Sequence, residues 1–284
     1  MTRILVTGAP GFIGRYLVPE LRSAGHDVIA MTSASGDVAE KSTWAGFPQT
    51  EVVVHLAARS FVPDSWNDPG GYIRANLLGT VAALGYCRAH EARLVFLSSY
   101  LYGDPERLPI SEHAPLVAQN PYALSKKLAE EACRFFADRF GVNVTVLRPF
   151  NVYGAGQSEQ FLIPSIIRQL EQGEEIRVKD LAPRRDYVYV RDVVRAIAKA
   201  AEGRRGFGVF NVGSGTSHSV EALIGIIQEV WRKQLPVVSA EERRKGEIMD
   251  TIADISHAER EIGWKPHYTL RQGLADMHDA TPLR

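Results

Sequence analysis

A tyrosine and a lysine four residues apart are the side chains in this sequence best suited to chemistry. Tyr122 and Lys126 follow Asn120-Pro121, a pair that can supply the N-cap and first position of a helix expected to reach about residue 140. Residues four apart lie on one helix face, one turn from each other. Because a nearby ammonium favours the ionised form of a phenol, the spacing predicts a usable general base.

A serine at the end of a strand is expected to join this pair. Residues 93–98 are expected to form a buried strand, in which the apolar run 94–97 leads to Ser98, followed by Ser99. In open parallel sheets, ligands bind at the carboxyl ends of the strands. We therefore predict that Ser98 lies at the edge of the sheet where a ligand binds.

Three glycines near the N-terminus predict where a dinucleotide binds. Gly8, Gly11 and Gly14 separate a β-branched run, residues 3–7, from an amphipathic run, residues 15–21. Strand, glycine turn and helix in this order allow a pyrophosphate to approach the backbone at the N-terminus of the helix. Phe12 and Ile13, between the glycines, are expected at the same site. Pro19 falls inside the helix and is expected to kink it.

The choice between NAD and NADP stays open at sequence level. An acidic residue about 20 positions after the glycines would bind the ribose hydroxyls, but Thr32 and Ser33 stand there, after a second predicted strand over 27–31. No arginine follows directly to bind a 2′-phosphate, although Arg15 could approach from the turn.

The alternation of strands and helices predicts an α/β fold with a doubly wound parallel sheet. Further strands are expected over 51–58 and 143–148, and a helix over 72–89. The later, less regular part predicts a smaller lobe over the carboxyl edge of the sheet. We expect residues 1–150 with about 186–212 to bind the dinucleotide, and about 151–185 with 213–284 to bind substrate.

Bulk composition excludes several classes of function. The 284 residues carry 33 basic and 33 acidic side chains, so no overall field attracts nucleic acid or an anionic membrane. No leader or spanning segment is evident, which predicts a cytoplasmic protein. Cys87 and Cys133 are too few and too far apart for a metal site, and no metal is expected. His55, inside a predicted strand, is expected to be a core residue with a satisfied ring.

Taken together, the motifs resemble those of the extended short-chain dehydrogenase/reductases, the NAD-dependent epimerase/dehydratase family that modifies nucleotide sugars. The resemblance spans nearly the whole chain. It comprises the glycine turn, Ser98 to Gly103, Tyr122 with Lys126, Arg148 to Gly154, Arg185 to Val190, Asn211 to Gly215, Arg244 to Glu247, Ala253 to Ser256 and Gly263 to Pro266.

The resemblance implies a role for each matched residue. Tyr122 would exchange a proton with a sugar oxygen, Ser98 would bind the same oxygen, and Lys126 would hold the nicotinamide ribose. The remaining implied contacts are Thr32, Asp37, Ala57 and Ala58 for the cofactor, and Ser99, Asn151, Arg185, Arg244 and Glu247 for the nucleotide-sugar substrate.

Departures from the family pattern bear on which reaction is catalysed. The 4,6-dehydratases carry an acid in the stretch where this chain has Ser99 and Tyr100, so dehydration is disfavoured. The leading hypothesis is an epimerase acting at sugar C4. The alternative is an NAD(P)H-dependent reductase of a nucleotide-linked 4-keto-6-deoxysugar, which the bulk of Tyr100 keeps open. A third is a non-enzymatic dinucleotide sensor, against which the intact Tyr122, Lys126 and Ser98 argue.

A homodimer is expected from the resemblance and from two predicted helices. Residues 72–89 and 121–140 carry apolar groups on more than one face, including Leu128, Phe135 and Phe136. Some of that surface requires cover.

Overall fold

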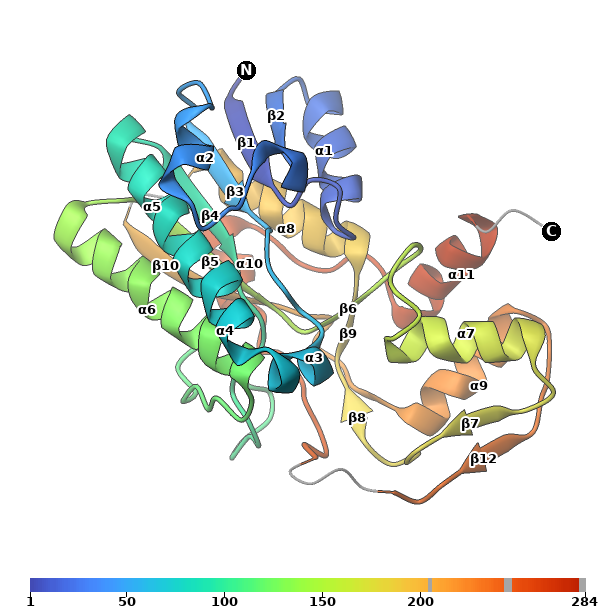
Figure 1. Ribbon diagram of the computed structural model, residues 1–284. Coiled ribbons are helices and arrows are strands. Elements are labelled where there is room, and N and C mark those ends of the chain that lie inside the picture. Colours follow the sequence, from blue (N-terminus) through green and yellow to red (C-terminus); the bar gives the residue numbers. More distant parts are fainter. Residues whose placement is uncertain (204–205, 243–246, 281–284) are drawn as a thin grey trace.

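Six parallel strands form the central sheet of the computed structural model, which describes residues 1–203, 206–242 and 247–280 (Figure 1). The strand order is β10-β5-β4-β3-β1-β2, so the chain winds outward in both directions from β1 and β3. This confirms the predicted doubly wound α/β fold. The strands are β1 (Arg3–Thr7), β2 (Asp27–Met31), β3 (Val52–His55), β4 (Arg93–Leu97), β5 (Val144–Pro149) and β10 (Phe207–Val212).

Helices cover both faces of the sheet because its strands are apolar on both sides. On one face lie α1 (Gly14–Ser23), α8 (Val190–Glu202) and α10 (Ser256–Ile262), whose side chains share a core with Phe210. On the other face lie α2 (Lys41–Ala45), α5 (Gly79–His90) and α6 (Pro121–Phe140), packed around Trp44 and Phe96. α1 continues through Pro19.

The predicted single helix over 72–89 is three pieces. α4 (Pro69–Tyr72) leads into a π-helical stretch, η2 (Ile73–Leu78), and then α5; α3 (Val62–Asn67) precedes them. Such π-helical turns interrupt the regular spacing of a helix face and occur often at functional sites. The third strand is also shorter than expected, since β3 ends at His55 and residues 56–58 leave the sheet. A 3₁₀ turn, η1 (Ser33–Ser35), follows β2.

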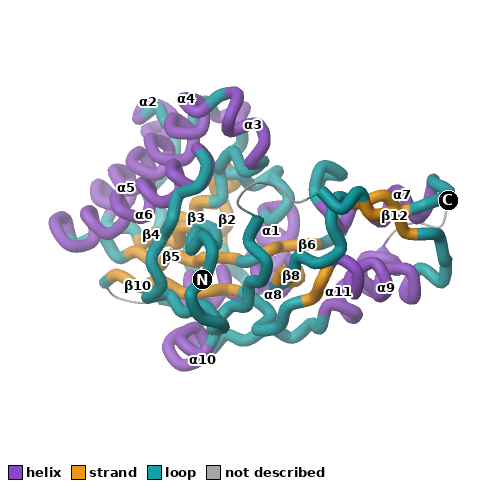
Figure 2. Tube along the Cα trace, turned by 90° about the horizontal axis from the view of Figure 1, so that it is seen from below, coloured by secondary structure: helices purple, strands orange, loops and turns teal. Residues whose placement is uncertain are grey.

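The later part of the chain forms a smaller layer of helices and paired strands past the carboxyl ends of the sheet (Figures 1 and 2). Its helices are α7 (Leu162–Gln172), α9 (Val220–Val230) and α11 (Leu270–Ala280), which pack around Ile166, Leu223 and Leu274. Its strand pairs are β6 (Asn151–Tyr153) with β9 (Tyr187–Tyr189), β7 (Ile176–Val178) with β12 (Val237–Ser239), and β8 (Arg184–Arg185) with β11 (His218–Ser219).

Two hydrogen bonds tie α1 to the loop that leads into this smaller part. Arg15 Nη2 donates to the Gly156 carbonyl at 2.7 Å, and the Tyr16 hydroxyl donates to the Ala155 carbonyl at 2.8 Å. On sequence alone, Arg15 was a candidate to approach a 2′-phosphate. In the structure its guanidinium is directed at this loop. Across the described ranges, no helix combines the length and apolarity needed to cross a membrane.

Candidate active site

The backbone of the turn between β1 and α1 packs too closely to admit side chains at two of its glycines. Gly8 has a φ of +66°, and a Cβ built on it would lie 2.8 Å from the Ala57 nitrogen. A Cβ on Gly14 would lie 2.4 Å from the Ala9 carbonyl oxygen. Glycine is therefore required here by the backbone itself. This glycine turn and the N-terminus of α1 fit the pyrophosphate of a dinucleotide.

One cleft of about 540 Å³ gathers most of the residues that the sequence singled out. The predicted residues that line it are Gly8, Gly11, Phe12, Ile13, Gly14, Ala58, Ser98, Ser99, Tyr122, Lys126 and Asn151. Thr32, Asp37, Ala57, Arg185 and Glu247 are not among its lining residues, although Ile248, next to Glu247, is. Arg244 lies outside the described residues.

Tyr122 and Lys126 enter the cleft from the first turns of α6. The Asn120 side chain accepts from the Ala123 nitrogen at 2.8 Å and caps the helix, as the sequence predicted. The Lys126 ammonium donates to the Leu97 carbonyl at 2.6 Å and lies 4.2 Å from the centre of the Phe96 ring. Burial lowers the pKa of Lys126 to about 8, and the charge of Glu130 opposes this shift.

The pKa of Tyr122 is set differently from the sequence-based expectation. Burial raises this pKa above its ordinary value, and a hydrogen bond with Ser99 is the largest effect that lowers it. The predicted depression by Lys126 is not among the leading causes, because the ammonium is directed at the Leu97 carbonyl. The Tyr122 ring also meets the Tyr72 ring edge to face, at 6.4 Å between centres.

The two serines after β4 have different partners. Ser98 is buried, and its hydroxyl donates to Glu130 Oε1 at 2.5 Å rather than to Tyr122. Ser99 is half-buried and lines the cleft, and its side chain lowers the pKa of Tyr122. The structure therefore brings Ser98 to the cleft, with its hydroxyl directed at Glu130.

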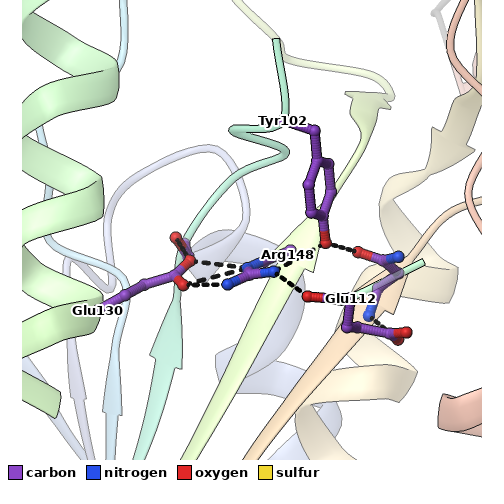
Figure 3. Close-up of polar contacts among 6 residues, drawn as sticks. Tyr102, Glu112, Glu130 and Arg148 are labelled. Carbon is purple, nitrogen blue, oxygen red and sulfur yellow. Dashed lines mark hydrogen bonds and ion pairs between the residues drawn. The ribbon is translucent and has the colours of Figure 1, made fainter. Parts of the chain in front are cut away.

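Glu130 belongs to a buried polar network beneath the cleft (Figure 3). Its carboxylate pairs with Arg148, whose Nη2 lies 2.6 Å from Oε2; both side chains are less than a tenth exposed. Arg148 Nη1 donates to the Tyr102 hydroxyl at 3.0 Å, and Tyr102 donates in turn to Asn211 Oδ1 at 2.5 Å. Buried charges of this kind are stable only when paired and hydrogen-bonded, as these are.

Sequence reasoning missed Glu130 and Asn76. Glu130 stands four residues after Lys126, so extending the same helix face by one turn would have found it. Asn76, in η2, accepts from the Arg59 nitrogen at 2.8 Å and donates to the Arg59 carbonyl and to Ser125 Oγ, at 3.0 Å and 2.8 Å. It thereby fixes the loop after β3 against α6. No local pattern marks Asn76, because its partners come from two distant segments.

Three residues expected to contact the cofactor lie outside the cleft lining: Asp37 is exposed, and Thr32 and Ala57 are half-buried. Thr32 caps the 3₁₀ turn η1, and its backbone nitrogen donates to Ser35 Oγ at 3.3 Å. Asp37 pairs with Arg74 at 2.9 Å. The hydrogen bond from the Ala39 nitrogen, and then the one from Arg74, lower the pKa of Asp37. Ala57 donates its backbone nitrogen to Thr7 Oγ1 at 3.1 Å.

The residues expected to bind the substrate are engaged with protein groups. Arg185 forms an ion pair with Glu247, and its Nη1 donates to the Ile248 carbonyl at 2.6 Å. The two paired side chains are 15% and 17% exposed, so both charges are largely removed from water. The Asn151 amide donates to the Asp186 carbonyl at 3.0 Å, and Tyr100 donates to Asn151 Oδ1 at 3.4 Å.

His55 is a core residue, as the sequence predicted, but its ring is only half satisfied. Thr7 Oγ1 lies 2.8 Å from His55 Nδ1, whereas Nε2 has no hydrogen-bond partner among the described residues. Burial, followed by the charge of Lys126, lowers the pKa of His55 to about 3. Within the same described ranges, no group of His, Cys, Asp and Glu could hold a metal ion.

Comparison with known proteins places the chain in a family. Residues 4–213 match the NAD dependent epimerase/dehydratase family. GDP-6-deoxy-D-mannose reductase of Pseudomonas aeruginosa is 31% identical over 290 residues, which cover 96% of this chain and 94% of that protein.

Two solved structures have the same fold over almost their full length. The structure of RMD from Pseudomonas aeruginosa complexed with NADPH aligns with a TM-score of 0.91 and 30% identity, covering 98% of each chain. The UDP-glucose-4-epimerase of Stenotrophomonas maltophila, with bound NAD and formylated UDP-arabinopyranose, aligns with a TM-score of 0.91 and 28% identity. That alignment covers 98% of this chain and 97% of the epimerase. With its glycine turn, its tyrosine and lysine on α6 and a match over most of its length, this chain belongs to the NAD dependent epimerase/dehydratase family.

Proposed function

We propose that this protein is an epimerase of nucleotide-diphosphate sugars, acting at sugar C4 with a bound NAD or NADP. The observation that carries the proposal is the meeting of Tyr122, Lys126 and the glycine turn in one cleft. A bound nicotinamide dinucleotide supplies the chemistry that the side chains lack, since it accepts and returns a hydride.

The side chains of the cleft handle the proton. Tyr122 takes the proton of the sugar 4-hydroxyl while hydride leaves the same carbon, and returns it after the keto sugar has turned over. The Ser98-Ser99 pair supplies a hydroxyl donor at this oxygen. Lys126 holds the nicotinamide ribose through its ammonium. Burial lowers the pKa of this group to about 8.

The nucleotide end of the substrate is assigned to the smaller part of the chain. Arg185 and Asn151 would bind the diphosphate, which calls for charge-assisted donors, and Glu247 would accept from the nucleotide ribose. We assign residues 1–150 with 186–212 to the dinucleotide, and 151–185 with 213–284 to the sugar nucleotide. Support comes from the similar epimerase, which holds NAD and a UDP-sugar together.

We also propose a cytoplasmic homodimer. The free cysteines Cys87 and Cys133 are buried and reduced, as is usual in a reducing compartment. On α6, Leu124, Phe135 and Phe140 are 44%, 54% and 40% exposed, which leaves apolar side chains that a partner could cover. A single species of monomer mass by light scattering at micromolar concentration would refute the dimer.

The reductase is the second candidate, and Tyr100 favours it. The Tyr100 ring stacks on Phe150 at 5.3 Å, with 18° between the planes, and forms a bulky wall of the cleft. An epimerase has to let the keto sugar turn over beside this wall, whereas a reductase does not. The similarity to GDP-6-deoxy-D-mannose reductase supports the same alternative.

Denaturing the freshly purified protein and identifying any released dinucleotide by mass and amount tests the proposal. An epimerase recycles its cofactor, so we expect nearly one dinucleotide per chain, and its mass decides between NAD and NADP. A protein that is purified empty and binds NADH or NADPH reversibly would favour the reductase. Failure to bind either dinucleotide would refute both candidates.

A further inference from the structure

Two phenylalanines from different parts of the molecule meet at the edge of the cleft. Phe61 stands directly before α3, in the part that carries the glycine turn, and Phe161 stands directly before α7, in the smaller part (Figure 1). Their ring centres lie 5.9 Å apart, with 74° between the planes. Aromatic pairs favour this edge-to-face arrangement. An apolar contact between side chains therefore joins the two parts here.

The contact lies at the rim of the cleft rather than in the core. Phe161 lines the cleft, and so do Ser60 and Val62, on either side of Phe61. Both rings are half-buried, so each keeps some contact with water. The three glycines of the turn between β1 and α1 line the same cleft. A dinucleotide held at that turn, as the proposed function requires, would occupy the cavity whose rim these rings form.

The backbone that carries Phe61 is anchored next to Tyr122. The Tyr72 hydroxyl donates to the Phe61 carbonyl at 2.5 Å, and the Tyr72 ring in turn meets the Tyr122 ring edge to face. In the first turn of α3, Ser65 Oγ donates to the Val62 carbonyl at 2.6 Å. The loop after β3 is thereby held against α6.

The backbone that carries Phe161 is anchored as well. The Phe161 nitrogen donates to the Ser158 carbonyl at 3.1 Å, and the Phe161 carbonyl accepts from the Ser165 nitrogen at 3.0 Å. Just before them, Gln157 Nε2 donates to the Val152 carbonyl at 2.8 Å. Both backbones are thus held by hydrogen bonds, whereas the contact between the rings contains none. The rings can part and meet again without disturbing either backbone.

We propose that Phe61 and Phe161 form a clasp over the bound dinucleotide, which has to open each time the dinucleotide enters or leaves. The inference rests on the proposed function, because it requires a dinucleotide at the glycine turn. It extends that function, because a clasp slows exchange of the cofactor between turnovers. An epimerase, which regenerates its own cofactor, gains from this retention, whereas a reductase would have its turnover limited by the opening step.

Stopped-flow measurement of dinucleotide exchange tests the clasp. Binding of NADH or NADPH to the emptied protein is followed by nicotinamide fluorescence, and release is followed after displacement by excess oxidised dinucleotide. In Phe61→Ala and in Phe161→Ala we expect both rates to rise about three- to tenfold, because an aromatic pair no longer has to part. The Kd should change by less than about twofold, because the contact stabilises the free and the loaded protein alike.

A double variant and a neighbouring aromatic residue provide the controls. If the two rings act through each other, the variant that carries both substitutions should exchange dinucleotide no faster than either single variant. Trp66→Ala is the matched control, because Trp66 also belongs to α3 but is 63% exposed. We expect its rates to equal those of the parent protein.

Three results, each in protein that binds a dinucleotide, would overturn the clasp alone. Parental rates in both single variants would show that the ring contact does not limit exchange. Faster release with unchanged association would show that the rings only touch the bound dinucleotide. Additive effects in the double variant would show that the two rings act separately. A protein that binds neither NADH nor NADPH would instead refute the proposed function, and the clasp with it.

Discussion

The residues proposed to bind the dinucleotide and those proposed to bind the substrate are held by different means. For the dinucleotide, the closely packed glycine turn at Gly8 and Gly14 and the capped start of α6 are already in place. For the substrate, Arg185 and Glu247 neutralise each other. Under the proposed function, the cofactor side is already organised, whereas the Arg185–Glu247 pair would have to open for Arg185 to bind a diphosphate. Ordering of this kind allows substrate binding to be coupled to closure of the site.

Removing the Tyr122 hydroxyl should give the largest effect, because it should lower kcat without weakening the binding of dinucleotide or substrate. We expect Tyr122→Phe to lower kcat by about a thousandfold, which is typical of a lost general acid and base, while dinucleotide affinity stays close to that of the parent. Tyr187→Phe is the matched control, because the buried Tyr187 hydroxyl has no hydrogen-bond partner within the described ranges. A Tyr122→Phe enzyme with parental kcat would remove Tyr122 from the mechanism.

A side chain in the glycine turn should weaken dinucleotide binding and leave the substrate-binding residues unchanged. In Gly14→Ala the new methyl group meets the Ala9 carbonyl oxygen at 2.4 Å. Overpacking of this kind costs about 1–3 kcal/mol, on the order of ten- to a hundredfold in dinucleotide affinity, measured by calorimetry.

A helix glycine in the smaller part of the chain provides the control for Gly14→Ala. A Cβ on Gly225, in α9, meets no atom within 4 Å, so Gly225→Ala should bind the dinucleotide as the parent does. Equal affinity in the parent and Gly14→Ala would mean that the turn relaxes freely.

The buried His55, in the sheet beside the cofactor turn, should make the free energy of unfolding depend on pH. Because burial lowers its pKa to about 3, the unfolded chain takes up a proton near pH 6.5 that the folded chain does not. The neutral ring thus contributes its full stability above pH 6.5 and loses it as pH falls toward 3. We expect a loss of about 2 kcal/mol in the free energy of unfolding between pH 7 and pH 5.

Urea unfolding of His55→Gln and His113→Gln at both pH values checks this prediction. His55→Gln should remove the pH-dependent loss, and the exposed His113 serves as the control for losing one histidine. If His55→Gln keeps the full slope from pH 7 to pH 5, His55 is not its source.

A double-mutant cycle on Arg185 and Glu247 should give the smallest effect and sharpen the description of the substrate side. The pair is largely buried, so we expect a coupling of about 1 kcal/mol in the free energy of unfolding. The exposed pair Arg271 and Glu229 is the control and should couple more weakly. Saturating UDP-glucose should abolish the Arg185–Glu247 coupling if binding opens the pair, and coupling that persists would show that it stays closed.

Sequence alone predicted the parts of this site that depend on neighbours along the chain. The strand, glycine turn and helix at residues 3–21, the cap at Asn120 and the shared face of Tyr122 and Lys126 all follow from backbone geometry over a few residues. The strand alternation likewise predicted the sheet, and the motifs predicted the family.

Partners that come from distant segments were beyond such reasoning. Ser98 meets Glu130, 32 residues away, and Arg185 meets Glu247, 62 residues away. Which of these groups pair depends on how whole elements pack. The same packing breaks the expected helix over 72–89 at η2, where Asn76 is drawn toward Arg59.

The bonds from α1 to the 155–156 loop bear on how relatives of this protein can be recombined. Arg15 and Tyr16 stand directly after the cofactor turn, yet they hold carbonyls of the segment that leads into the substrate side. A chimaera joined just after β5 would take the 155–156 loop from one parent and Arg15 and Tyr16, which bind it, from the other. A junction placed after Gly156 keeps donor and acceptor from one parent, which makes it the better crossover point for transferring sugar specificity between homologues.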